Sequence, residues 1–264
     1  MVRSVMYTTP FVIVIMLLAV GLFTGCEGDH IQPGTTGNLL LYITDAPGEF
    51  DEVNLNVVRV EVHREGGPWE VINNENQTID LLEYRNGMMA VLADADLDAG
   101  IYTQIRLILG DGNNVVVDGV PHNLTVPSGM QTGLKLVRSF AIEPDYTYEL
   151  VIDFNVHHSI HTSELGYMLK PTVRVEPLAL TGAIGGYVTP VGVDAVVSAM
   201  QEDEVVTAAY PDETTGMFKM IALPPGEYHL EIEADGFEKY TSDIMVVQAG
   251  HTTDAGTIEL EASE

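Results

Sequence analysis

The sequence predicts an all-β protein made of two β-sandwich domains that follow an amino-terminal export segment. Short apolar runs alternate with polar residues along most of the chain, and Gly, Pro and Asp separate these runs at close spacing. A period of two is typical of half-buried strands, and many short strands at close spacing favour a sandwich or a barrel. Apart from the apolar amino-terminal stretch, no segment has a sustained helical period.

We divide the 264 residues into four segments. Residues 1–25 are predicted to be a signal peptide and residues 26–37, rich in Gly and Pro, a flexible tether. Residues 38–179 are predicted to form the first sandwich and residues 180–264 the second. The boundary is placed near Leu180 because the strand pattern restarts there, after Pro177.

The amino-terminal segment has the layout of a signal peptide. Arg3 precedes an apolar run from Phe11 to Phe23, and no acidic residue occurs before Glu27. The run is short for a transmembrane helix, which needs roughly 20 apolar residues. The sequence therefore favours cleavage after export over a permanent membrane span.

Cys26 is the predicted lipidation site. Phe23-Thr24-Gly25-Cys26 resembles the lipobox of bacterial lipoproteins, with Phe23 in place of the usual Leu, and Cys26 is the only cysteine in the chain. The alternative is a chance cysteine at the end of an ordinary secretory signal. The resemblance implies a cell-envelope protein held on a membrane by lipid on Cys26. Glu27 follows where an inner-membrane retention signal would have Asp, which favours the outer membrane in a Gram-negative source.

The composition argues against nucleic acid as a partner. The formal net charge is −28, with 39 Asp and Glu against 11 Lys and Arg. Phosphate recognition needs clustered basic residues. The excess of acids is typical of a soluble, self-repelling surface; a saline habitat or bound divalent cations would also account for it.

Several strands are predicted in the first domain. Residues 38–44 and 148–154 are compact apolar runs, and 101–109 alternates with Ile101 on the inward face. In residues 53–62 the apolar phase shifts by one after Val57, which predicts a β-bulge at Val57-Val58. Asp118-Gly119 predicts a hairpin turn.

Three further segments of the first domain have weaker signals. Residues 168–175 are predicted to form one strand, with Pro171 marking an edge or a bulge. The acidic stretch from Asp94 to Asp98 is expected to be a turn before a strand, and residues 81–93 have room for a short helical turn.

The second domain is expected to open with a strand over residues 182–188. Leu223-Pro224-Pro225-Gly226 predicts a turn that starts another strand. In that strand Tyr228, Leu230 and Ile232 alternate with outward-facing His229, Glu231 and Glu233.

Both domains resemble known families. Residues 37–177 resemble a domain of unknown function found in bacterial lipoproteins, through Thr44-Asp45-Ala46-Pro47, Tyr102-Thr103-Gln104-Ile105-Arg106-Leu107, Val126-Pro127-Ser128-Gly129, Gly133-Leu134-Lys135-Leu136, Asp153-Phe154 and Leu169-Lys170-Pro171. Residues 181–260 resemble the carboxypeptidase regulatory-like domain, through Gly186-Tyr187-Val188, Ala195-Val196-Val197, Thr215-Gly216-Met217-Phe218, Leu223-Pro224-Pro225-Gly226-Glu227-Tyr228 and Ala234-Asp235-Gly236-Phe237. The first resemblance implies a lipoprotein context and a β-rich fold but no known activity, and the second implies a small transthyretin-like sandwich that is a non-catalytic accessory. The expected fold class is therefore two β-sandwiches of immunoglobulin-like or transthyretin-like type.

His157, His158 and His161 are the weak candidates for a metal site, with Asp153 and Glu164 nearby in the sequence. Imidazole and carboxylate ligands suit zinc, copper or nickel. The alternative is a polar, solvated loop.

The common nucleophile, zinc-protease, phosphate-loop and dinucleotide motifs are absent from the sequence. We therefore expect no enzyme activity and no cofactor. The expected function is a non-catalytic binding or structural role in contact with an envelope protein or a glycan. The alternative is a metal-dependent hydrolase or metal-binding protein that uses the three histidines.

Overall fold

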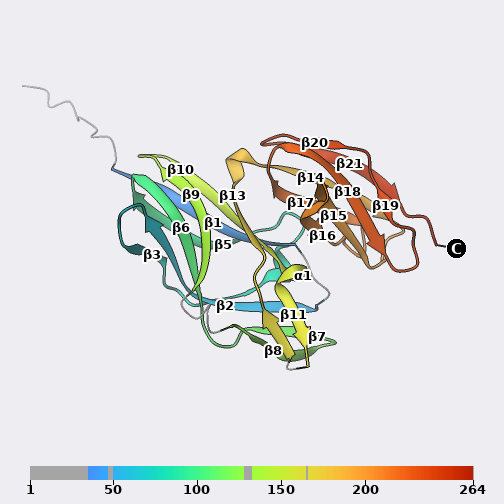
Figure 1. Cartoon of the computed structure of the whole chain (residues 1–264), viewed down its shortest axis with the longest axis horizontal. Helices are drawn as coiled ribbons and strands as arrows, with labels where there is room; N and C mark the ends of the chain where they lie inside the picture. Colours follow the sequence, from blue (N-terminus) through green and yellow to red (C-terminus); the bar gives the residue numbers. More distant parts are fainter. Residues whose placement is uncertain (1–34, 47–49, 128–132, 165, 264) are drawn as a thin grey trace, which may run out of the picture. The chain divides into compact units, whose positions relative to one another are not determined.

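The computed structural model describes residues 35–46, 50–127, 133–164 and 166–263. Most of this part of the chain is β-strand, arranged in several sheets, which confirms the predicted all-β class (Figure 1). Cys26, the predicted signal peptide and the predicted turn at Pro47-Gly48 lie outside the described residues. Among the residues described, no helix has the length and hydropathy needed to cross a membrane.

The first sandwich consists of strands joined by turns and a few short helical segments. Its described elements are β1 (Thr36–Ala46), β2 (Glu52–Arg64), β3 (Trp69–Asn73), β4 (Gln77–Asp80), η1 (Leu81–Tyr84), β5 (Ala90–Asp98), β6 (Gly100–Leu109), β7 (Asn114–Val117), β8 (Val120–Thr125), β9 (Leu134–Ile142), β10 (Thr147–Asn155), α1 (Val156–Ser159), β11 (Ile160–Ser163), β12 (Gly166–Leu169), β13 (Val173–Pro177) and η3 (Leu178–Leu180).

Two sheets enclose the core of the first sandwich. The four-stranded sheet has the order β13-β10-β1-β5, and the nine-stranded sheet has the order β11-β12-β8-β7-β2-β6-β9, with β3 and β4 also paired to β2. Leu39, Leu41 and Ile43 of β1 pack in the same buried cluster as Val60 and Val62 of β2. The alternating apolar side chains of both sheets therefore meet face to face.

The predicted β-bulge in β2 is present. The pairing register between β2 and β6 shifts between Val57 and Arg59. Val57 and Val60 are consequently both buried, at 2% and 1% exposure. The shift keeps the apolar side chains of both halves of the strand on the core side.

The prediction of which β6 side chains point into the core is wrong for the first residues of the strand. The register between β6 and β9 shifts between Tyr102 and Gln104. Because of this irregularity Tyr102 is fully buried and Ile101 is 49% exposed. The tyrosine hydroxyl donates a hydrogen bond of 3.1 Å to the carbonyl of Asp98, which satisfies its polar group inside the sandwich.

Two other local predictions are also corrected. Residues 168–175 do not form one strand: β12 ends at Leu169 and pairs in the nine-stranded sheet, whereas β13 begins at Val173 and pairs in the four-stranded sheet. Asp94 to Asp98 are part of strand β5 and not a turn, and Asn38 of β1 donates a side-chain hydrogen bond of 2.7 Å to Asp94.

The second sandwich contains the remaining strands of the described chain. They are β14 (Gly182–Thr189), β15 (Ala195–Gln201), β16 (Glu204–Ala209), β17 (Met217–Leu223), β18 (Gly226–Ala234), β19 (Tyr240–Thr241), β20 (Met245–Val247) and β21 (Thr252–Glu259). One sheet has the order β17-β14-β21, and the other has the order β16-β15-β18-β19, with β20 also paired to β18.

The second sandwich has its own hydrophobic core. Phe218, Leu230 and Ile232 are fully buried in a cluster that contains no described residue of the first sandwich. The predicted alternation in β18 is confirmed, with Tyr228, Leu230 and Ile232 inside and Glu231 and Glu233 outside. No sheet of the described chain combines strands from before and after η3.

Candidate functional site

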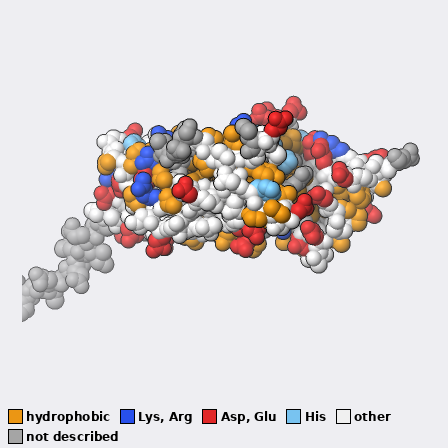
Figure 2. Space-filling model, turned by 90° about the horizontal axis from the view of Figure 1, so that it is seen from below, with side chains coloured by type: hydrophobic (Ala, Val, Ile, Leu, Met, Phe, Trp, Pro, Cys, Tyr) orange, Lys and Arg blue, Asp and Glu red, His pale blue; other side chains and the backbone are white. Residues whose placement is uncertain are grey.

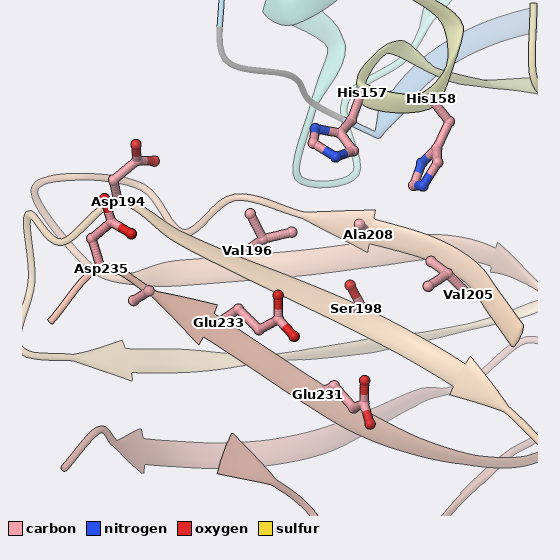
Figure 3. A pocket seen from close by; sticks show the side chains of 11 residues that line it. His157, His158, Asp194, Val196, Ser198, Val205, Ala208, Glu231, Glu233 and Asp235 are labelled. Carbon is pink, nitrogen blue, oxygen red and sulfur yellow. The ribbon is translucent and has the colours of Figure 1, made fainter. Parts of the chain in front are cut away.

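Polar side chains from both sandwiches line a cleft of about 440 Å³. His157 and His158 come from α1 of the first sandwich (Figure 3). Facing them are residues of the second sandwich on β15, β16 and β18 and at their ends, namely Asp194, Val196, Ser198, Val205, Ala208, Glu231, Glu233, Ala234 and Asp235. Imidazole groups therefore oppose carboxylates across the cleft.

Local hydrogen bonds hold the two histidines on a single helical turn. Asn155 caps α1, and its side-chain oxygen accepts a hydrogen bond of 3.0 Å from the backbone N–H of His158. The rings of His157 and His158 lie edge to face, with centroids 4.9 Å apart. Partial burial lowers the pKa of His158, and the neighbouring His157 lowers it further. A neutral imidazole is therefore favoured at this position near neutral pH.

The carboxylates of β18 belong to an ion-pair group on the opposite side of the cleft. Lys239 contacts Glu231 at 2.9 Å and Glu233 at 3.0 Å, and these two contacts raise the pKa of Lys239. All three side chains are at least partly solvent-exposed, so the contribution of these pairs to stability is small.

The structure brings together only two of the three predicted metal-site histidines. His161 lies on β11, exposed and opposite Met168. Throughout the described ranges, no group of three or more His, Cys, Asp or Glu side chains has a geometry that could hold a metal ion. The expected solvated loop is replaced by the helical turn α1 and strand β11, although the three histidines are solvent-exposed.

Asp153 lines a second cleft together with His158, and its carboxylate forms a buried contact between the sandwiches. It is 5% exposed, forms an ion pair with Arg174 of β13 and accepts a hydrogen bond of 3.2 Å from the hydroxyl of Thr207 on β16. Arg174 also donates to the carbonyl of Ala222 at 3.3 Å. A buried charge that is paired and hydrogen-bonded in this way stabilises one specific arrangement of its neighbours.

A second polar contact between the sandwiches is centred on Asn86. Its side-chain nitrogen donates a hydrogen bond of 3.4 Å to the carbonyl of Tyr210, and its side-chain oxygen accepts one of 3.3 Å from the backbone N–H of Lys219. Asn86 has a left-handed backbone conformation, with a φ of 55°. Asn adopts this conformation more readily than most residues.

The sequence contains no local signal for either contact between the sandwiches. Asp153 and Thr207 are 54 residues apart, and Asn86 and Lys219 are 133 residues apart. The placement of a polar residue on a strand face could be inferred from alternation. Its partner depends on how the two sandwiches pack.

The chain is thus an all-β protein in which polar contacts join two sandwiches. Residues 36–171 match the family described as "Domain of unknown function (DUF4382)". This match covers more than half of the chain, so the chain belongs to that family. No curated protein matches the chain.

Among the solved structures that are similar to the chain, three illustrate the likeness, and each aligns with 85% or 86% of the chain. The TIE protein of Bacillus anthracis is 16% identical with a TM-score of 0.25, and the alignment covers 86% of this chain and 34% of that one. The minor pilin GBS52 of Streptococcus agalactiae is 12% identical with a TM-score of 0.24, covering 85% and 96%. The major pilin subunit BcpA of Bacillus cereus is 10% identical with a TM-score of 0.24, covering 86% and 100%. The chain thus spans about a third of the length of the first of them.

Proposed function

We propose that the protein is a lipid-anchored envelope protein with a non-catalytic binding or structural role. The observation that carries the proposal is how the chain uses two of its three buried carboxylates. Asp153 is paired with Arg174, and Glu61 is paired with both Arg59 and Arg106. These groups join strands or sandwiches to each other and are occupied in doing so, which is the behaviour of structural and not of reacting carboxylates.

The anchoring part of the proposal rests on the sequence. The apolar segment from Phe11 to Phe23 and the lipobox-like Phe23-Thr24-Gly25-Cys26 support export and lipidation at Cys26. A diacylglyceryl group with an additional acyl chain exceeds the two-chain requirement for stable membrane attachment. The resemblance of residues 181–260 to carboxypeptidase regulatory-like domains, which are non-catalytic accessories, supports a binding or spacer role for the second sandwich.

Fatty-acid labelling of cells that express the protein tests the anchor. The wild-type chain should incorporate labelled fatty acid and sediment with membranes, whereas Cys26→Ser should remain an unlabelled precursor. Because Cys26 is the only cysteine, Thr24→Ser is a suitable control that leaves a small residue before the lipidated position. Equal labelling of the wild type and Cys26→Ser would show that Cys26 carries no lipid.

A further inference from the structure

One face of the nine-stranded sheet is cationic, although the chain as a whole is strongly acidic. Strand register places Glu61 of β2 opposite Val71 of β3 and Arg106 of β6, and Arg106 opposite Lys135 of β9. Residues paired in this way project from the same face of a sheet. In the next row His63 lies opposite Trp69 and Gln104, and Gln104 lies opposite Val137. We call this surface the cationic face, defined by Arg59, Trp69, Val71, Arg106, Lys135 and Val137.

Glu61 orients the two arginines of the cationic face. It is 5% exposed. One of its oxygens accepts a hydrogen bond of 2.6 Å from Nε of Arg106, and the other contacts Nε of Arg59 at 2.7 Å. The Arg106 guanidinium also lies 4.1 Å from the centre of the Trp69 ring. Two guanidinium groups are therefore held in place by one buried carboxylate and one aromatic ring.

Arg106 uses both Nε and a terminal nitrogen on Glu61 and is 19% exposed, whereas the contacts of Arg59 leave more of its donors available in the described part of the chain. A guanidinium group has five donor N–H bonds, and Arg59 uses only its Nε in the pair with Glu61. The side chain of Arg59 is 46% exposed. With Lys135 next to Arg106, three cations surround a single buried anion. The net charge of this group is positive, and almost half of the Arg59 side chain is open to solvent.

The cationic face differs in charge from the chain as a whole, and it also carries exposed apolar side chains. The chain has 39 Asp and Glu and 11 Lys and Arg. Figure 2 shows Lys and Arg side chains beside hydrophobic ones at one end of the visible face, with acidic side chains there and along the rest of that face. Val137 is 83% exposed and Val71 is 54% exposed. Trp and Arg are enriched among the residues that dominate binding energy, and exposed apolar surface beside them favours an interaction site.

We infer that the cationic face binds an acidic polysaccharide. Charge complementarity selects an anionic partner. Arg59, Arg106 and Lys135 lie on three adjacent strands, which are spaced by about 4.8 Å in a sheet. The cations therefore form a strip and not a pocket. Such a strip suits an extended polymer with repeated carboxylates and apolar C–H faces, which can lie against Val71, Val137 and the edge of Trp69.

An extended glycan also fits the charge of the surrounding surface better than the other anionic partners. A folded acidic protein or an anionic bilayer presents a broad negative surface, which would face the acidic remainder of a chain with a net charge of −28. A single polysaccharide chain needs to contact only the cationic strip. This inference rests on the proposed non-catalytic binding role and identifies the class of its partner.

The test measures binding of the full-length chain, purified in an uncharged detergent, to immobilised polygalacturonate. The test variant is Arg59→Gln with Lys135→Gln, which keeps Glu61 paired with Arg106. The matched control is Lys239→Gln: Lys239 is 48% exposed and ion-paired with two glutamates, much as Arg59 is 46% exposed and paired with Glu61. Poly-glutamate, vesicles with anionic lipid, and neutral dextran serve as competing probes.

The expected result is saturable binding by the wild type and by the control, about tenfold weaker binding by the double variant, and weaker binding as salt increases. No binding to neutral dextran is expected. Equal binding by the double variant and the wild type would overturn the inference, as would equal weakening by Lys239→Gln. Preferential binding to poly-glutamate or to vesicles would overturn it in favour of an acidic protein or a membrane. Fatty-acid labelling of Cys26 would be unchanged in all of these cases, so the proposed anchoring is tested separately.

Discussion

The hydroxyl of Thr207 in the second sandwich donates a hydrogen bond of 3.2 Å to the carboxylate of Asp153 in the first. Both side chains are at least nine-tenths buried, with exposures of 3% and 5%. Asp153 is already paired with Arg174, which in turn donates to the carbonyl of Ala222. The four residues form a continuous polar link between strands β10 and β13 on one side and β16 and β17 on the other.

Thr207→Val is expected to destabilise the protein by about 2 kcal/mol, because it removes a hydrogen bond to a buried charged group. Urea denaturation of the full chain measures the change as a lower midpoint. Thr207→Ser keeps the hydroxyl and serves as the control, with a smaller loss. Wild-type stability of Thr207→Val would show that the hydrogen bond contributes nothing measurable.

Asp45→Asn should be more stable than the wild type, and this difference in the free energy of unfolding should grow as pH rises. Asp45 is 6% exposed, and its Oδ2 has no hydrogen-bond partner in the described chain. Burial raises the pKa of Asp45 well above its ordinary value of 3.8; the hydrogen bond from the Val156 N–H lowers it, and the nearby carboxylates of Asp153 and Asp80 raise it.

The sign of this pH dependence follows from proton binding. Between the ordinary and the raised pKa, the folded chain holds a proton that the unfolded chain releases. The wild type therefore loses stability as pH rises from about 4 through the folded pKa, whereas the amide that replaces the carboxyl group in the variant does not titrate. Urea unfolding at about pH 4, 6 and 8 should show a growing stability difference in favour of Asp45→Asn. A difference that does not change with pH would contradict the prediction.

The purified chain, prepared without a histidine tag, should carry no stoichiometric zinc, copper or nickel. His157 and His158 lie together on α1, but His161 is on β11, and in the described residues these side chains do not form a three-ligand group. Elemental analysis of the wild type and of the variant with all three histidines changed to Ala measures this. Stoichiometric metal that is lost in the variant would instead support the metal-dependent alternative.

Fragments 37–179 and 180–264 should each unfold cooperatively. Each contains a separate buried cluster, one around Leu41 and one around Phe218. Each fragment should be less stable than in the full chain, because Asp153 and Asn86 lose their partners in the second sandwich. Circular dichroism with urea tests this, and failure of both fragments to fold would show that the two sandwiches depend on each other.

Strand positions could be predicted where apolar alternation has a single phase. The bulge in β2 can be predicted from the sequence, because Val57 ends one alternating apolar run and Val58 begins another of opposite phase. In β6 the corresponding shift was hidden, because Ile101 and Tyr102 are both apolar and either could face inward. Local sequence therefore predicts a strand better than it predicts the face of each residue.

The polar sites were harder to predict, because they depend on register between distant strands. Glu61 and Arg106 are 45 residues apart and meet only because they are paired across β2 and β6. The histidines at 157, 158 and 161 are close in sequence, yet the change from α1 to β11 separates the third from the other two. Closeness along the chain was a poor guide to a shared site.

Strand β1 occupies an interior position in its sheet, parallel to β10 and antiparallel to β5. Hydrogen bonds between strands run across the strand direction. A mechanical pull on the amino-terminal end of β1 along its axis would therefore load both ladders in shear, and the bonds would share the force instead of opening one after another. An edge strand that is pulled sideways loses its hydrogen bonds one at a time. A protein tethered through an interior strand such as β1 would therefore keep its first sandwich folded under a larger force.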